Sequence, residues 1–153
     1  TGTTHRIIAE LIDLGVENTE IPTLLFDNSS FGRLQILGRA LQNMKVITEH
    51  KTAYITLTQD ELNSFGYVKG DTEGIVNYGL SIKGIVFAAI FIENKEEKII
   101  KISFRSQGDF DVNQFARDYF NGGGHRNAAG GKSEVSMEET IRKFEDLVTK
   151  LSI

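Results

Sequence analysis

The hydrophobic residues before Lys45 recur at helical spacing, whereas most of those after it alternate as they do in strands. A first helix is predicted from an N-cap at Thr3 or Thr4 to a left-handed residue at Gly15. Its hydrophobic face comprises Ile7, Ile8, Leu11 and Ile12. The residues that follow offer this face little to pack against, so we expect the helix to be the end of a preceding domain.

A second helix is predicted to begin at Ser29 or Ser30, after one or two helical turns around Pro22. Its hydrophobic stripe comprises Leu34, Leu37, Leu41 and Met44, with Arg33, Arg39 and Gln42 turned away. We expect the stripe to be a packing surface and the helix to connect two domains.

Strands and helices are mixed in the rest of the chain. The predicted strands are 46–48, 52–57, 85–92, 98–105 and 130–135. The predicted helices are 59–65, a short helix or helical loop within 71–80, a helix from a cap at Asp109 or Asp111 to Phe120, and 137–151. Capping boxes at Thr58 with Glu61 and at Ser136 with Glu139 open two of the helices. This order predicts an α/β fold in which flanking helices pack on a single mixed β-sheet, preceded by a helical linker.

Composition excludes several classes of protein. The chain of 153 residues is 40% hydrophobic, has no Cys, and contains no hydrophobic run near the length of a membrane span. Without Cys there is no thiolate metal site, and the three His residues show no zinc-binding spacing. A net charge of −4 argues against a protein that coats long nucleic acids, and a cytoplasmic location is compatible with these features.

The most distinctive stretch is the glycine-rich run at 121–131, in which Gly122, Gly123 and Gly124 precede His125 and Arg126. Consecutive glycines can turn their backbone N–H groups inward to form an anion-binding nest, and the alternative is a merely flexible connection. We expect a phosphate cradle here, followed by a helical turn at 127–129 whose amides face the same ligand.

Arg105 stands at the end of the strand predicted for 98–105, on the side opposite Ile100, Ile102 and Phe104. A guanidinium at a strand end is held firmly and can bind two phosphate oxygens. A solvent-facing arginine is the alternative. Arg105 is therefore a second candidate for phosphate binding.

Several motifs occur together in the second half of the chain. They are Asp71-Thr72-Glu73-Gly74 with Val76-Asn77-Tyr78, Ser81-Ile82-Lys83-Gly84, Lys101-Ile102-Ser103-Phe104-Arg105-Ser106 followed by Asp111-Val112, and Gly122-Gly123-Gly124-His125 with Asn127-Ala128-Ala129-Gly130. Over residues 20–153 the chain resembles the DHH-associated C-terminal domain of DHH-family phosphoesterases. It is most similar to the bifunctional oligoribonuclease and 3′-phosphoadenosine-5′-phosphate phosphatase group, the nanoRNases.

The resemblance implies a two-domain enzyme whose N-terminal catalytic domain holds two manganese ions through Asp and His ligands, including an Asp-His-His signature. That signature is absent from this sequence. We therefore expect no catalytic residue or metal site here, and no activity from this chain alone. Residues 1–44 would be the end of the catalytic domain and the linker, and residues 45–153 the substrate-binding domain.

The resemblance also implies which residues bind substrate. They are Arg105, Ser106, Gly122, Gly123, Gly124, His125 and Asn127, with Asn127 ordering the loop. The expected partners are short RNA oligonucleotides or 3′-phosphoadenosine-5′-phosphate and the chain's own catalytic domain. No membrane contact is expected, and homodimer formation is left open.

Other functions are compatible with the same motifs. The chain could belong to a cyclic-dinucleotide phosphodiesterase or an exopolyphosphatase-related member of the superfamily. It could also be a non-catalytic nucleic-acid-binding module, like the related domains of alanyl-tRNA synthetases, although its leucine helix is short for their coiled-coil connector.

Overall fold

The computed structural model describes residues 1–17 and 29–151. The chain divides into two compact units, Thr1–Phe31 and Gly32–Ile153. The helical turns predicted around Pro22 lie outside the described residues.

The first unit contains helix α1 (Gly2–Asp13). Its N-cap is Thr1, whose side chain accepts a hydrogen bond from the Thr4 amide at 3.3 Å, so the predicted cap at Thr3 or Thr4 is wrong. The predicted end is confirmed, because Gly15 has a φ of +92° and the Val16 amide donates back to the Leu11 carbonyl at 3.1 Å. Among the described residues, no side chain of α1 is buried.

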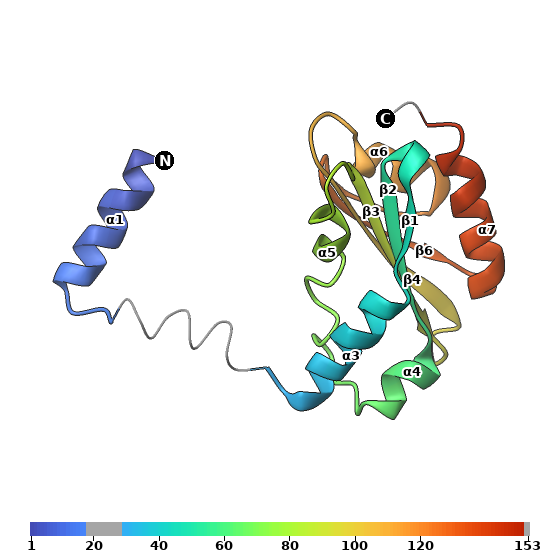
Figure 1. The fold of residues 1–153 in the computed structure, drawn as a ribbon, viewed down its shortest axis with the longest axis horizontal. Coiled ribbons are helices and arrows are strands. Elements are labelled where there is room, and N and C mark those ends of the chain that lie inside the picture. Colours follow the sequence, from blue (N-terminus) through green and yellow to red (C-terminus); the bar gives the residue numbers. More distant parts are fainter. Residues whose placement is uncertain (18–28, 152–153) are drawn as a thin grey trace. The chain divides into compact units, whose positions relative to one another are not determined.

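The second unit is built on one six-stranded sheet (Figure 1). Its strands are β1 (Lys45–Ile47), β2 (Thr52–Leu57), β3 (Phe87–Asn94), β4 (Ile99–Ser106), β5 (Gly123–His125) and β6 (Ala128–Ser133), in the order β1-β2-β3-β4-β6-β5. A short 3₁₀ turn, Thr48–His50, joins β1 to β2. Strands β2 and β3 are parallel and the other neighbours are antiparallel. The predicted mixed sheet with flanking helices is confirmed.

Helices α6 (Val112–Tyr119) and α7 (Met137–Val148) cover one face of this sheet and enclose an aromatic core. Figure 1 shows α7 and α5 on opposite sides of the sheet. Phe104 of β4 packs against Phe115 of α6 and Phe144 of α7, with ring centroids 5.4 and 6.5 Å apart. Tyr119, the last residue of α6, is 40% exposed.

Tyr54 of β2 supplies a polar group in this core. Its hydroxyl donates a hydrogen bond to Glu145 of α7. Burial, together with the negative charge of Glu145, raises the pKa of the Tyr54 phenol well above its usual value. The phenol therefore stays protonated and links α7 to the sheet.

Helices α3 (Phe31–Gln42), α4 (Gln59–Ser64) and α5 (Asn77–Leu80) contribute to a second core on the other face. The side chains of α3 that are fully buried are Ile36 and Ala40, whereas Leu34 and Leu41 are 53% and 43% exposed. Within the described residues, these two positions of the predicted packing stripe therefore do not pack against the core. A small residue at Ala40 lets the helix approach the core closely, and Leu34 and Leu41 lie beyond that contact.

Arg33, predicted to turn away from the domain, instead anchors the start of α3. Its guanidinium donates to the carbonyls of Gly70 and Glu73 at 3.0 and 3.3 Å. These contacts tie α3 to the loop that precedes α5.

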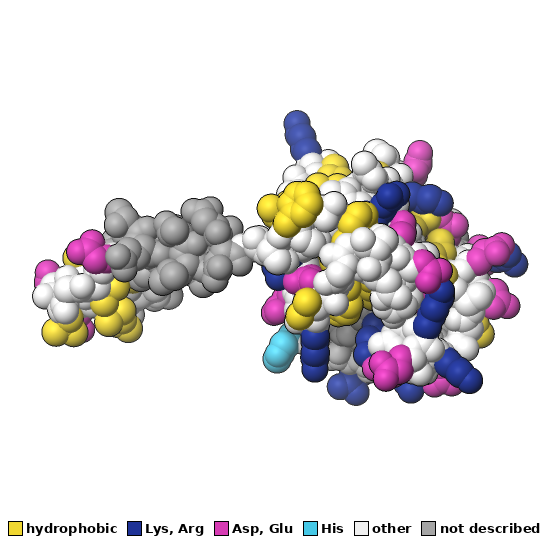
Figure 2. Space-filling view, turned by 90° about the horizontal axis from the view of Figure 1, so that it is seen from below, with side chains coloured by type: hydrophobic (Ala, Val, Ile, Leu, Met, Phe, Trp, Pro, Cys, Tyr) yellow, Lys and Arg dark blue, Asp and Glu magenta, His cyan; other side chains and the backbone are white. Residues whose placement is uncertain are grey.

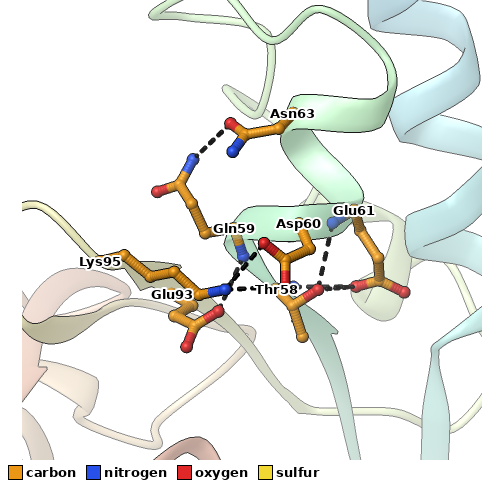
Figure 3. A network of polar contacts seen from close by, with 7 residues as sticks. All are labelled: Thr58, Gln59, Asp60, Glu61, Asn63, Glu93 and Lys95. Atoms are coloured by element: carbon orange, nitrogen blue, oxygen red, sulfur yellow. Dashed lines mark hydrogen bonds and ion pairs between the residues drawn. The ribbon is translucent and has the colours of Figure 1, made fainter.

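The predicted capping box of α4 is confirmed (Figure 3). Burial alone would raise the pKa of Glu61, but hydrogen bonds from Thr58 and Asn43 outweigh it and hold this pKa below its usual value. The Gln59 amide donates to Glu93 at 2.9 Å, so the start of α4 is joined to the end of β3. The second predicted box, Ser136 with Glu139, opens α7.

No helix in the described part of the chain has the length and hydrophobicity required to cross a lipid bilayer.

Candidate functional site

The glycine-rich run forms a β-hairpin at one edge of the sheet. In the register of the strands, Arg105 of β4 lies opposite Ala128 of β6, and Ala128 lies opposite His125 of β5. The Arg105 and His125 backbones are therefore two strand spacings apart, roughly 10 Å. The structure thus brings the two predicted phosphate-binding segments together.

The helical turn predicted at 127–129 is wrong. Ala128 and Ala129 begin strand β6, which pairs with β4 over six residues from Ala128 to Ser133. The exposed edge of β4 offers this segment a full set of backbone partners, and that pairing outweighs the helical preference of alanine. The Val112 amide also donates to the Arg126 carbonyl at 2.8 Å, which fixes the hairpin turn against the start of α6.

Close backbone packing explains two of the glycines. A Cβ at Gly122 would lie 1.9 Å from the Gly130 carbonyl oxygen, and one at Gly124 would lie 2.5 Å from the Ala128 carbonyl oxygen. Their amides also have acceptors, since Gly122 donates to the Ala116 carbonyl at 3.1 Å and Gly124 to the Asn113 side chain at 2.8 Å. The prediction that these amides face an anion is therefore wrong for Gly122 and Gly124, because both amides hold the hairpin in place.

Asn127 and Ser106 connect the hairpin turn to the end of β4. The Asn127 side-chain amide donates to the Ser106 hydroxyl at 2.9 Å and to the Gly108 carbonyl at 3.1 Å. The buried Ser106 hydroxyl in turn donates to the Phe110 carbonyl at 2.7 Å. Asn127 thus orders the loop, and a direct contact of Ser106 with a ligand would require one of these bonds to be replaced.

Arg105 lies on the sheet face opposite α6, because the adjacent Phe104 belongs to the core beneath α6. Its guanidinium is half-buried and donates to the Phe104 carbonyl at 2.9 Å. Ser103, Ala128 and Gly130 lie on the same face and remain partly exposed. The neighbours of Arg105 on this face therefore include several small residues.

The cationic side chains near the hairpin differ in their partners. Arg126 is paired with Asp109 at 3.1 Å, and Lys132 is paired with Glu134 at 3.1 Å. Arg105 and the exposed His125 have no acidic partner among residues 1–17 and 29–151. An incoming anion would therefore meet positive charge and N–H donors that no internal carboxylate neutralises.

Asn113, which none of the sequence motifs singles out, also contributes to the hairpin. The Asn113 side-chain oxygen accepts hydrogen bonds from the Gly124 amide and from Nε of Arg117, at 2.8 and 3.1 Å. Asn113 therefore satisfies a backbone donor of the edge strand β5 and orients Arg117 at the same time. Its spacing of four residues from Arg117, just before the glycines, is the signal that could have identified it.

The described residues offer no metal-ligand cluster, and the face shown in Figure 2 has no continuous basic surface. The described residues contain no group of three or more His, Cys, Asp or Glu side chains that could hold a metal ion. They therefore do not fit a manganese centre. On the face shown in Figure 2, basic and acidic side chains are interspersed. A long polyanion would therefore meet no continuous basic track on that face.

The fold and the site define an α/β domain with a glycine-rich hairpin at one edge of its sheet, and the comparisons with known proteins identify its class. The DHHA1 domain family matches residues 43–151. The chain belongs to this family, so the resemblance to the DHH-associated domain is confirmed at that level.

Two solved structures resemble the chain. An exopolyphosphatase-related protein from Bacteroides fragilis is 41% identical with a TM-score of 0.92, over 98% of this chain and 44% of that protein. A pGpG-specific phosphodiesterase from Vibrio cholerae is 16% identical with a TM-score of 0.56, over 95% of this chain and 50% of that protein. The chain therefore spans half or less of the length of each, and the second likeness concerns the fold alone.

Proposed function

We propose that this chain is the substrate-binding part of a phosphoesterase that hydrolyses short oligoribonucleotides and 3′-phosphoadenosine-5′-phosphate, as in the nanoRNases. Arg105 and His125 bind phosphate oxygens, while the glycine hairpin lets a nucleotide approach the backbone closely. Asn127 and Ser106 hold the hairpin in register with β4. The DHHA1 family and the 41% identity to an exopolyphosphatase-related protein support this proposal.

The observation that carries the proposal is the row Arg105–Ala128–His125 across three neighbouring strands. It places two side chains, neither of which has an acidic partner in the described part of the chain, on either side of a small residue near one edge of the sheet. A rigid sheet of this kind fixes the separation of the donors, so it can orient a short ligand for reaction elsewhere. The site has no obvious row of aromatic platforms for a long strand.

Hydrolysis itself belongs, in this proposal, to a separate domain of a longer protein. The two manganese ions implied by the resemblance would be held there, since the described residues supply no suitable ligand group. The B. fragilis relative, of which the chain matches 44%, is long enough to contain such a domain. The proposal includes a cytoplasmic location for the protein.

A ligand panel tests the proposal and its alternatives. We expect calorimetric titration of the chain to detect binding of 3′-phosphoadenosine-5′-phosphate and of a two-nucleotide RNA. Polyphosphate and a cyclic dinucleotide serve as competitors, because the B. fragilis relative is described as exopolyphosphatase-related and a cyclic-dinucleotide phosphodiesterase is the related alternative. Preferential binding of either competitor would favour that alternative, and no binding of any ligand would contradict the proposed function.

A further inference from the structure

Helix α6 brings a third cation to the glycine hairpin. The guanidinium carbon of Arg117 lies 3.6 Å from the position that a Cβ on Gly123 would occupy, so the side chain rests against β5. Its Nε donates to Asn113 at 3.1 Å. The Asn113 side-chain oxygen also accepts a hydrogen bond from the Gly124 amide, so this one side chain fixes both β5 and Arg117.

The rest of the Arg117 guanidinium is available. Arg117 is exposed, and neither of its terminal nitrogens has a hydrogen-bond or ion-pair partner among the residues that the structure describes. Nearby Arg126 differs, because Asp109 pairs with it at 3.1 Å. Arg117 is therefore an oriented arginine whose two terminal NH₂ groups lie beside the hairpin without a carboxylate partner.

Arg117 and Arg105 meet the hairpin at different strands. Arg117 rests against Gly123 of β5, whereas Arg105 extends from β4, and β6 lies between these two strands. The backbones of β4 and β5 are therefore two strand spacings apart, roughly 10 Å. This arrangement suits two separate anionic groups better than a single one.

We propose that Arg117, held by Asn113, binds a second phosphate group of the ligand, distinct from the phosphate that Arg105 and His125 bind. This inference rests on the proposed function and adds to it a preference for ligands with two phosphate groups over those with one. Arg117 supplies the contact and Asn113 acts as its positioning residue. Neither residue was singled out by the sequence motifs.

The test compares the affinities of 3′-phosphoadenosine-5′-phosphate and AMP, which differ by one phosphate. In Arg117→Met the affinity for the bisphosphate should fall roughly tenfold or more, while the affinity for AMP stays within about twofold. Arg142→Met is the matched control, because it removes an exposed helical arginine that is paired with Glu138 on α7. That control should preserve both affinities.

Asn113→Leu distinguishes positioning from a purely structural role. If Asn113 acts through Arg117, the ratio of the bisphosphate affinity to the AMP affinity should fall in Asn113→Leu. The variant that carries both substitutions should then have a ratio no lower than that of Arg117→Met alone. If both ligands lose affinity equally, Asn113 only supports the hairpin and its proposed role is wrong. Should Asn113→Leu fail to fold, Arg117→Met still decides the inference.

The outcomes separate the two proposals. Wild-type binding of both ligands with an unchanged ratio in Arg117→Met overturns this inference and leaves the proposed function intact. If the wild-type chain binds neither 3′-phosphoadenosine-5′-phosphate nor AMP, both proposals are contradicted.

Discussion

Gly122→Ala should destabilise the domain by about 3 kcal/mol, at the upper end of the range for overpacking. The added Cβ would lie 1.9 Å from the Gly130 carbonyl oxygen and 2.7 Å from the Gly131 Cα, both of which belong to backbone that pairs with β4. The clash cannot be relieved by a rotamer change, so the hairpin must move away from the sheet. Chemical denaturation of the purified chain measures the loss.

Two other glycines provide matched controls for this variant. A Cβ at Gly123 would make only ordinary contacts, the nearest at 3.5 Å from the Asn113 side-chain oxygen, so Gly123→Ala should cost less than about 1 kcal/mol. A Cβ at Gly38 in α3 would meet nothing within 4 Å, and Gly38→Ala should stabilise the domain by up to about 1 kcal/mol. Equal losses at Gly122 and Gly123 would show that flexibility, rather than close packing, requires the glycines.

Arg105→Met should weaken binding of 3′-phosphoadenosine-5′-phosphate roughly ten- to a hundredfold, as expected for loss of a charge-assisted contact of about 1.5–3 kcal/mol. Methionine retains much of the hydrophobic stem and removes the guanidinium that donates to the Phe104 carbonyl. His125→Ala should also weaken binding, with a smaller loss because one exposed imidazole nitrogen can donate a single hydrogen bond to a phosphate oxygen, whereas a guanidinium can donate two. Calorimetry gives both affinities.

Arg126→Met is the informative control for these two substitutions. Arg126 adjoins His125 in the sequence, but its guanidinium is already paired with Asp109. Its removal should change the affinity by less than about threefold, since exposed paired charges contribute little. A loss as large as that of Arg105→Met would indicate general electrostatic attraction in place of a specific contact.

Local sequence patterns predicted local structure well. The capping boxes at Thr58 and Ser136 depend on residues three positions apart, and both form as expected. The alternation of hydrophobic and polar residues in 98–105 is also a local pattern, and it correctly identified the buried side of β4. Where packing between distant segments decides, prediction failed: Leu34 and Leu41 are exposed because the core selects Ile36 and Ala40, and residues 127–129 form a strand because β4 offers them a partner.

For the site, the sequence predicted the residues better than their arrangement. Arg105 and the glycine run were singled out separately, but their alignment through Ala128 depends on a strand register that no local pattern specifies. The roles of Gly122 and Gly124 in close packing and the contacts of Asn113 depend on how α6 meets the hairpin. Such contacts between elements cannot be derived from spacing alone.

The central claim is that a small phosphorylated nucleotide binds at the hairpin beside Arg105, and ¹H–¹⁵N NMR titration with 3′-phosphoadenosine-5′-phosphate tests it most directly. The account predicts that the largest changes in amide chemical shift occur at Gly123, Gly124, His125 and the end of β4, with little change along α7. Changes confined to α7 or α4, with the hairpin signals unmoved, would contradict it.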